Sequence, residues 1–225
     1  MSHPSSLWVT IPAKPLDEGK SRLASALTGQ ERHGLARRLL ENTLGVILAV
    51  PGLAGVIVVS RDAEILRLAA GYGVLALSEK TNGTAASGEK EWGLNQAVAQ
   101  AAEFARHAMG DALLFLPTDL PLLQADDIRT LVRAWDGREK CVVIAPSHDG
   151  GTNALLLSPP DAIAPSFGVE SFARHIRLAE EKGLAVEVVE SEGLAWDVDT
   201  PEEYRLMDGL KNGHGSTQIL SDLHG

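Results

Sequence analysis

The sequence has few of the residues that build disulfide scaffolds or zinc centres. Cysteine occurs once, as Cys141 in an apolar run, so the chain cannot form an internal disulfide and a buried structural thiol is the simplest interpretation. The seven histidines include no His-x-x-x-His helix pair, which gives a dedicated metal cage little support. The Gly-x-x-x-x-Gly-Lys pattern of a P-loop is also missing. Nucleotide or metal chemistry would therefore need another set of residues.

Positive charge is also scarce. The chain has 20 Lys and Arg against 30 Asp and Glu, a net charge of -10, which argues against nucleic acid and against anionic membrane as partners. No apolar run approaches membrane-spanning length and no basic segment with an apolar core opens the sequence, so we expect a cytoplasmic protein. An anionic substrate would need a local group of cations or a metal ion.

The remaining composition is that of an ordinary globular protein. With 225 residues, 44% of them hydrophobic and 22% charged, the chain can bury a substantial core. We predict a single domain over residues 1–225, with a core at 6–206 and a polar C-terminal tail at 207–225.

Apolar runs and helical periods alternate along the chain. The pattern predicts strands near 7–11, 56–60, 74–77, 113–116, 142–146, 154–157 and 186–189, and helices near 31–49, 62–70, 93–107, 126–135, after 168 and from 201. Alternating strands and helices indicate an α/β fold with a mostly parallel, doubly wound sheet and an antiparallel, β-rich second half. The segment 78–92 shows no period and is predicted to be a long loop.

One strand leads directly into a carboxylate. The apolar run 113–116 is typical of a strand buried on both faces of a parallel sheet, and Pro117 and Pro121 force it to end around Asp119. Ligands of open α/β sheets bind at the carboxyl ends of the strands, so Asp119 is the leading candidate for a functional residue. An aspartate in this position can also simply cap a loop, and that alternative stays open at this point.

A basic loop follows the first strand. Lys14, Lys20 and Arg22 form a local positive field in an acidic protein, and cations with backbone amides after a first strand suit a phosphate. Solvated surface lysines are the alternative.

Two further acids, Asp197 and Asp199, lie late in the chain. Together with Asp119 they are hard oxygen ligands with no His or Cys cluster nearby, an inventory that suits phosphate-bound Mg²⁺ better than zinc. Thr200 fits a helix N-cap with Glu203 as its reciprocal capping-box acid, which accounts for those two residues structurally but leaves Asp197 unexplained. His175 is interpreted as a phosphate contact or a surface histidine rather than a general base.

Several segments, in order from residue 8 to about 206, resemble one enzyme family. They are Ile11–Leu16 with Lys20–Leu23, Gly93–Asn95, Leu116–Pro121, Gly150–Leu155, Phe167–Gly168 with Ser171–Phe172, and Asp197–Pro201. Together they resemble the CofC/FbiD family, phospholactate or phosphoenolpyruvate guanylyltransferases in the biosynthesis of the deazaflavin coenzyme F-420. Any one segment is weak evidence, but their shared order is specific.

The resemblance implies a GT-A-like nucleotidyltransferase fold and transfer of GMP from GTP to a small phospho-acid, with release of pyrophosphate. It implies Mg²⁺ held by Asp119, Asp197 and Asp199, with Asp197 favoured over Asp199 as a direct ligand. It implies that Lys14, Lys20 and Arg22 contact the triphosphate and take part in catalysis. It places Ser21, Ser60 and Asn95 on the nucleotide side of the site. It places Thr152, Gly168 and Ser171 on the acceptor side.

Two residue positions depart from the family pattern, and the second of these departures lies in the acceptor loop. Thr118 stands where a small residue such as Ala is usual, and Val169-Glu170 replaces the commoner Pro-containing turn. The acceptor is therefore open among 2-phospho-L-lactate, phosphoenolpyruvate and 3-phosphoglycerate. Two rival functions also remain: a nucleotidyltransferase for molybdopterin or a sugar phosphate, and a non-catalytic nucleotide-binding module. A homodimer is allowed by the sequence.

Overall fold

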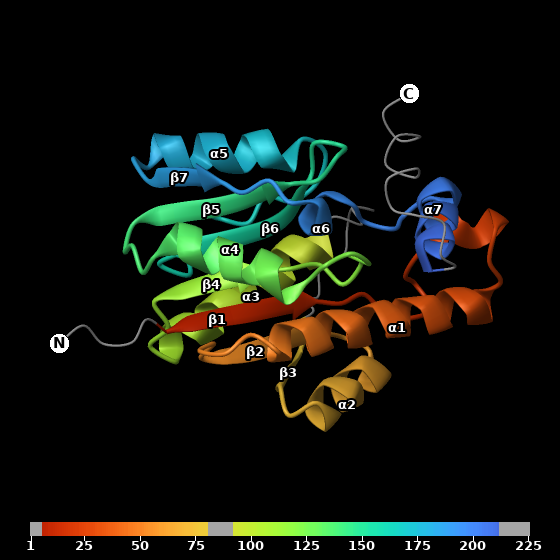
Figure 1. Ribbon diagram of the computed structural model, residues 1–225. Coiled ribbons are helices and arrows are strands. Elements are labelled where there is room, and N and C mark those ends of the chain that lie inside the picture. Colours follow the sequence, from red (N-terminus) through yellow and green to blue (C-terminus); the bar gives the residue numbers. More distant parts are fainter. Residues whose placement is uncertain (1–5, 81–91, 212–225) are drawn as a thin grey trace.

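A seven-stranded sheet forms the centre of the molecule in the computed structural model, which describes residues 6–80 and 92–211 (Figure 1). The strands are β1 (Leu7–Pro12), β2 (Gly55–Ser60), β3 (Leu75–Ser78), β4 (Ala112–Phe115), β5 (Cys141–Pro146), β6 (Thr152–Ser158) and β7 (Ala185–Val188). Their order in the sheet is β3-β2-β1-β4-β6-β5-β7. The predicted long loop lies mostly at 81–91, outside the described residues.

Helices connect the strands and cover both faces of the sheet (Figure 1). They are α1 (Gly29–Leu48), α2 (Ala63–Gly71), α3 (Trp92–His107), α4 (Ala125–Trp135), α5 (Ser171–Glu181), α6 (Glu192–Ala195) and α7 (Pro201–Lys211), with a 3-10 turn, η1, at Ser21–Ser25. Helix α7 continues past 206, and the rest of the predicted tail lies outside the described residues. The short elements η1 and α6 were not predicted, because neither is long enough to show a period.

The alternation of side chains along the strands explains this layering. On β4, Leu114 packs with helices α1, α2 and α4, whereas Leu113 faces α3 and Phe115 joins a cluster with α3 and α5. All four residues of β4 are buried, as expected for a strand between two helical layers. The predicted α/β fold with a mostly parallel sheet is confirmed.

One strand runs against the others. Strand β6 pairs antiparallel with both β4 and β5, while β7 pairs parallel with β5. The predicted antiparallel half is therefore a single reversed strand within one continuous sheet. Because β6 is reversed, its first residue, Thr152, lies opposite Pro146 at the carboxyl end of β5. The start of β6 thus shares an edge with the ends of the parallel strands.

Candidate functional site

Three carboxylates meet at this edge of the sheet. Asp119 follows β4, whereas Asp197 and Asp199 come from the segment between α6 and α7. One oxygen from each of the three side chains lies within 4.8 Å of the others. The backbone joins the two segments as well, because the Val198 N–H donates to the Asp119 carbonyl at 3.1 Å. An all-oxygen group of this size has the chemistry that Mg²⁺ prefers in proteins.

Lys20 is the counter-charge of this acid cluster. Its Nζ lies 2.7 Å from Asp119 Oδ2 and 3.0 Å from Asp199 Oδ1, and its side chain is only 7% exposed. Burial by itself lowers the pKa of Lys20, but the two carboxylates outweigh it and raise that pKa above the ordinary value. Its backbone has φ 55°, in the left-handed region that non-glycine residues rarely occupy. The chain thus accepts local strain where it turns this lysine inward.

Asp197 and Asp199 differ in the direction of their pKa shifts. Burial, together with the charges of Asp119 and Asp199, raises the pKa of Asp197 to about 6. Asp199 is also buried, which alone would raise its pKa, but Lys20, Arg22 and Lys14 hold that pKa below the ordinary value. Of these two acids, Asp197 is therefore the one whose negative charge is less compensated.

The segment that carries Asp197 and Asp199 is fixed by the start of α7. The Glu203 carboxylate accepts from the backbone N–H groups of Asp199 and Thr200, both at 2.7 Å, and the Glu203 N–H donates to Thr200 Oγ1 at 3.3 Å. The predicted capping box is confirmed. Its acid reaches one residue further than expected, so the same bonds also hold Asp199.

The other basic residues lie around Lys20 on the outside. Arg22 Nη1 is 3.9 Å from Asp199 Oδ2, and its side chain is 73% exposed. Lys14 and Ser21 are exposed, and Lys14 is close enough to lower the pKa of Asp199. These side chains form an exposed cationic rim beside the acid cluster.

Ser60 and Asn95 are already used by the protein. Ser60 is 1% exposed, and its hydroxyl accepts from the Asp62 N–H at 3.1 Å. The Asn95 side chain accepts from the Phe167 N–H at 2.7 Å and donates to the Phe167 carbonyl at 3.3 Å. In this arrangement Asn95 fastens the 166–170 loop to α3, and a nucleoside contact by either residue remains a prediction.

A group of neutral polar side chains lies at the start of β6. Thr152 Oγ1 is 3.0 Å from Ser171 Oγ and 3.1 Å from His175 Nδ1. All three residues are buried. Next along β6, Asn153 Nδ2 lies 3.5 Å from Asp197 Oδ1. The successive residues Thr152 and Asn153 therefore connect this cluster of polar side chains to the acid cluster.

The interpretation of His175 as a surface residue is wrong. The side chain is 0% exposed, and burial with the nearby Arg174 charge lowers its pKa to about 4. It is neutral at physiological pH and packs edge-on against Phe167, with ring centroids 4.9 Å apart. A period-based reading of α5 places this residue on the inner face but cannot reveal its polar partners.

The loop that contains Gly168 is held from α5. Gly168 has φ 131° and Glu170 has φ 55°, so two of its residues occupy the left-handed half of backbone space. Arg174 donates to the Ser166 and Val169 carbonyls, at 3.3 Å and 2.6 Å. The sequence showed Arg174 only as a cation in the first turns of a helix. Its use as a loop clamp depends on the fold.

His148 is a further residue that the sequence did not indicate. Its ring stacks on Trp196 with centroids 4.2 Å apart. Its Nδ1 lies 4.0 Å from Asp197 Oδ1 and its Nε2 lies 3.5 Å from Glu203 Oε1. His148 therefore lies beside Asp197, and the turn between β5 and β6 brings it there.

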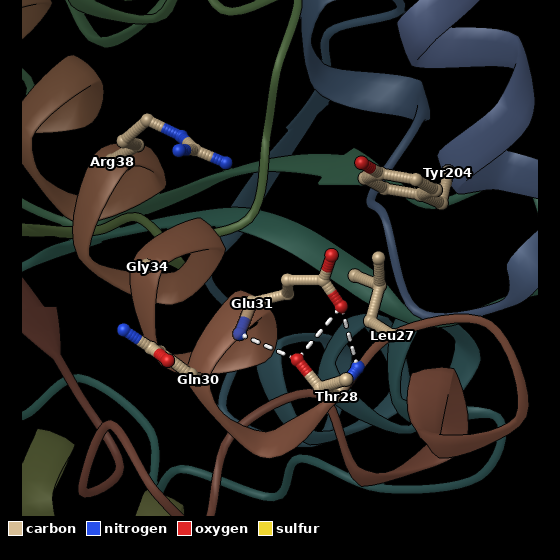
Figure 2. A pocket seen from close by; sticks show the side chains of 7 residues that line it. All are labelled: Leu27, Thr28, Gln30, Glu31, Gly34, Arg38 and Tyr204. Carbon is tan, nitrogen blue, oxygen red and sulfur yellow. Dashed lines mark hydrogen bonds between the residues drawn. The ribbon is translucent and has the colours of Figure 1, made fainter.

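A separate pocket lies between α1, the residues after η1, and α7 (Figure 2). Figure 2 shows Glu31 turned back onto Thr28, where the two residues form a capping box at the start of α1. None of the three clustered acids lines this pocket. Within the described parts of the chain, no helix is both long and apolar enough to span a membrane.

The chain is similar in sequence to two guanylyltransferases. The chain is 38% identical over 200 residues to phosphoenolpyruvate guanylyltransferase of Sphaerobacter thermophilus, covering 88% of this chain and 91% of that protein. It is 35% identical over 206 residues to 2-phospho-L-lactate guanylyltransferase of Methanothermobacter thermautotrophicus, covering 92% and 85%.

Solved structures match in fold. The 4-diphosphocytidyl-2C-methyl-D-erythritol synthase of Anaerococcus prevotii superposes with a TM-score of 0.63 at 12% identity, covering 93% of this chain and 97% of that one. Residues 7–219 match the family model described as guanylyl transferase CofC like. The resemblance seen in the sequence is thereby confirmed, and the chain belongs to the CofC-like guanylyl transferase family.

Proposed function

We propose that this protein transfers GMP from GTP to a small phospho-acid and releases pyrophosphate, in the biosynthesis of the deazaflavin coenzyme F-420. The observation that carries the proposal is the meeting, at one sheet edge, of three carboxylates, a buried lysine and an exposed cationic rim. Relatives named for this reaction with phosphoenolpyruvate and 2-phospho-L-lactate support it.

The acid cluster is the proposed Mg²⁺ site, with Asp119 and Asp197 as direct ligands and Asp199 shared between the ion and Lys20. The cluster fits a divalent cation because its carboxylate charges exceed the charge of Lys20, as the raised pKa of Asp197 indicates. When bound, Mg²⁺ supplies charge stabilisation to the phosphoryl oxygens. Asp197 is favoured over Asp199 as a direct ligand because the recorded ion pairs of Lys20 are with Asp119 and Asp199, which leaves the Asp197 carboxylate available.

The cationic rim, together with Lys20, is the proposed triphosphate site. Lys14, Lys20 and Arg22 hold the phosphates in line and stabilise the charge that develops as pyrophosphate leaves, with Ser21 next to them. The nucleoside side is assigned to Ser60 and Asn95. Since both side chains bond to backbone groups, they would act by shaping the site or by exchanging partners.

The cluster of polar side chains at the start of β6 is the proposed acceptor site. Thr152 and Ser171 offer hydroxyls, and Gly168 offers backbone in a conformation that leaves room for a ligand's phosphate or carboxylate. The acceptor's phosphate oxygen attacks the α-phosphorus of GTP, and the bond from that phosphorus to the leaving pyrophosphate breaks. A phosphate is already ionised near neutral pH, so the reaction needs no general base from the protein.

The test is pyrophosphate release with each of the four nucleoside triphosphates against phosphoenolpyruvate, 2-phospho-L-lactate and 3-phosphoglycerate. Molybdopterin and a sugar phosphate serve as the competing acceptors. Release with GTP and one phospho-acid supports the proposal. Release only with a competing acceptor contradicts the substrate class, and GTP binding without release from any acceptor indicates a non-catalytic module.

A further inference from the structure

His175 links the proposed acceptor hydroxyls to the loop that surrounds them, and its tautomer can be deduced from its partners. The Ser166 backbone N–H lies 2.9 Å from His175 Nε2. A backbone N–H can only donate, so Nε2 must be the unprotonated nitrogen of the ring. Nδ1 then carries the hydrogen, and it donates to Thr152 Oγ1 at 3.1 Å.

This assignment limits what the two hydroxyls can do. Thr152 Oγ1 accepts from His175, and one hydroxyl hydrogen closes its 3.0 Å bond to Ser171 Oγ. The pair owns two hydroxyl hydrogens, so one is left over whichever oxygen donates within the pair. Among the described residues, this second hydrogen has no recorded acceptor. A buried hydroxyl hydrogen without a partner is costly, which points to an external oxygen as its acceptor.

The opposite tautomer would give the opposite polarity. With hydrogen on Nε2, the ring would clash with the Ser166 N–H, and Nδ1 would take a hydrogen from Thr152. Both hydroxyl hydrogens would then be used inside the protein, and the pair would face the ligand with lone pairs only. An anionic ligand would be repelled by those lone pairs.

We propose that His175 is a positioning residue, whose Nδ1–H turns the Thr152–Ser171 pair into a hydrogen-bond donor for an anionic oxygen of the phospho-acid. This inference rests on the proposed function for the identity of the ligand. The recorded contacts of His175 are with Thr152, Ser166 and Phe167, none of which belongs to the acid cluster, so it acts through Thr152. The loop anchored at Ser166 keeps the ring in the required orientation.

Two substitutions separate this role from a merely structural one. His175→Asn keeps an amide N–H near the position of Nδ1 but loses the acceptor for Ser166, whereas His175→Gln keeps an acceptor near Nε2 but loses the donor to Thr152. We expect Gln to weaken equilibrium binding of phosphoenolpyruvate and 2-phospho-L-lactate about tenfold, and Asn to weaken it less than about threefold. The KM for GTP should stay within about twofold in both. His107→Gln on the exposed end of α3 is the matched control.

The reverse order, with Gln binding as the wild type and Asn failing, would mean that His175 serves only to anchor the loop and would overturn the proposal. So would an equal loss of affinity for GTP and the phospho-acid.

Nitrogen-15 spectra of histidine-labelled wild-type protein test the tautomer without any substitution. The Nδ1–H form at pH 7 supports the proposal, and the Nε2–H form or the imidazolium overturns it, even if a variant fails to fold. Calorimetric binding and the spectrum need no turnover. A wild type that binds phospho-acids with this tautomer but releases no pyrophosphate would therefore contradict the proposed function and leave the present inference standing.

Discussion

The two halves of the candidate site offer different chemistry to a ligand. The acid cluster with its cationic rim is charged and partly open, since Asp199 is 41% exposed and Arg22 is 73% exposed. The polar cluster of Thr152, Ser171 and His175 is neutral and buried, with each residue at most 7% exposed. The charged half draws on Coulomb attraction, while the neutral half relies on hydrogen bonds whose direction is set by packing. Charged groups suit an ion that binds reversibly, whereas neutral donors in fixed positions suit a ligand whose oxygen atoms match those positions.

Asp119→Asn gives the largest expected effect, because it removes charge from the acid cluster and a partner from Lys20. We expect the rate of pyrophosphate release to fall at least about a hundredfold at saturating substrates. Asp126→Asn, an exposed acid in the first turn of α4, is the control. A loss smaller than about tenfold, or ~1.4 kcal/mol of barrier, would show that the cluster does not carry the reaction.

Ser171→Ala tests whether the neutral half serves the acceptor alone. We expect the KM of the phospho-acid to rise about tenfold or more, while the KM of GTP stays nearly constant, because one of the two paired, buried hydroxyls is lost on the acceptor side only. Ser21→Ala in the cationic rim should show the reverse preference: any change should be confined to the KM of GTP, and the KM of the phospho-acid should stay constant. Equal effects of the two variants on both substrates would erase the distinction between the halves.

The charged half should be sensitive to pH through Asp197. Its pKa is raised to about 6, so a proton competes with a divalent ion below that pH. We expect Mg²⁺ or Mn²⁺ affinity, measured by calorimetry, to be constant above pH 7 and to fall about tenfold for each pH unit below 6. In Asp197→Asn the affinity should be lower and this slope should disappear. An unchanged slope in the variant would assign the titration to another group.

In the neutral half, the titration of His175 should make the free energy of unfolding depend on pH. The pKa of His175 is lowered to about 4 in the folded protein, against an ordinary value of about 6.5, so the unfolded chain binds more protons between these limits. Above pH 6.5 His175 contributes no pH dependence; as pH falls from 6.5 to 4, it lowers the free energy of unfolding by up to roughly 3 kcal/mol. Urea titrations of wild type and His175→Gln at pH 7 and pH 5 should show a smaller loss in the variant. Parallel losses would mean that the buried ring is not responsible.

The residues themselves mark the charged half of the candidate site more clearly than the neutral half. Asp119 is visible because prolines stop a buried strand beside it, and Lys20 because cations are rare in so acidic a chain. Both signals are local. His175, in contrast, lies in an ordinary amphipathic helix, and only the fold shows that its Nε2 meets the Ser166 N–H and its Nδ1 meets Thr152. A pattern of apolar and polar residues indicates that a side chain is buried, but it does not identify the atoms across from it.

The order of apolar runs and helical periods by itself determined the α/β fold. A strand buried on both faces leaves a continuous apolar run in the sequence, and an amphipathic helix leaves a helical period. The family resemblance was equally readable, since it depends on motifs in a fixed order. Only the tertiary structure decided that β6 runs against its neighbours and so carries Thr152 to the edge where Asp119 and Asp197 meet. Strand direction depends on pairing between segments far apart in sequence, and that pairing energy exists only once the sheet has formed.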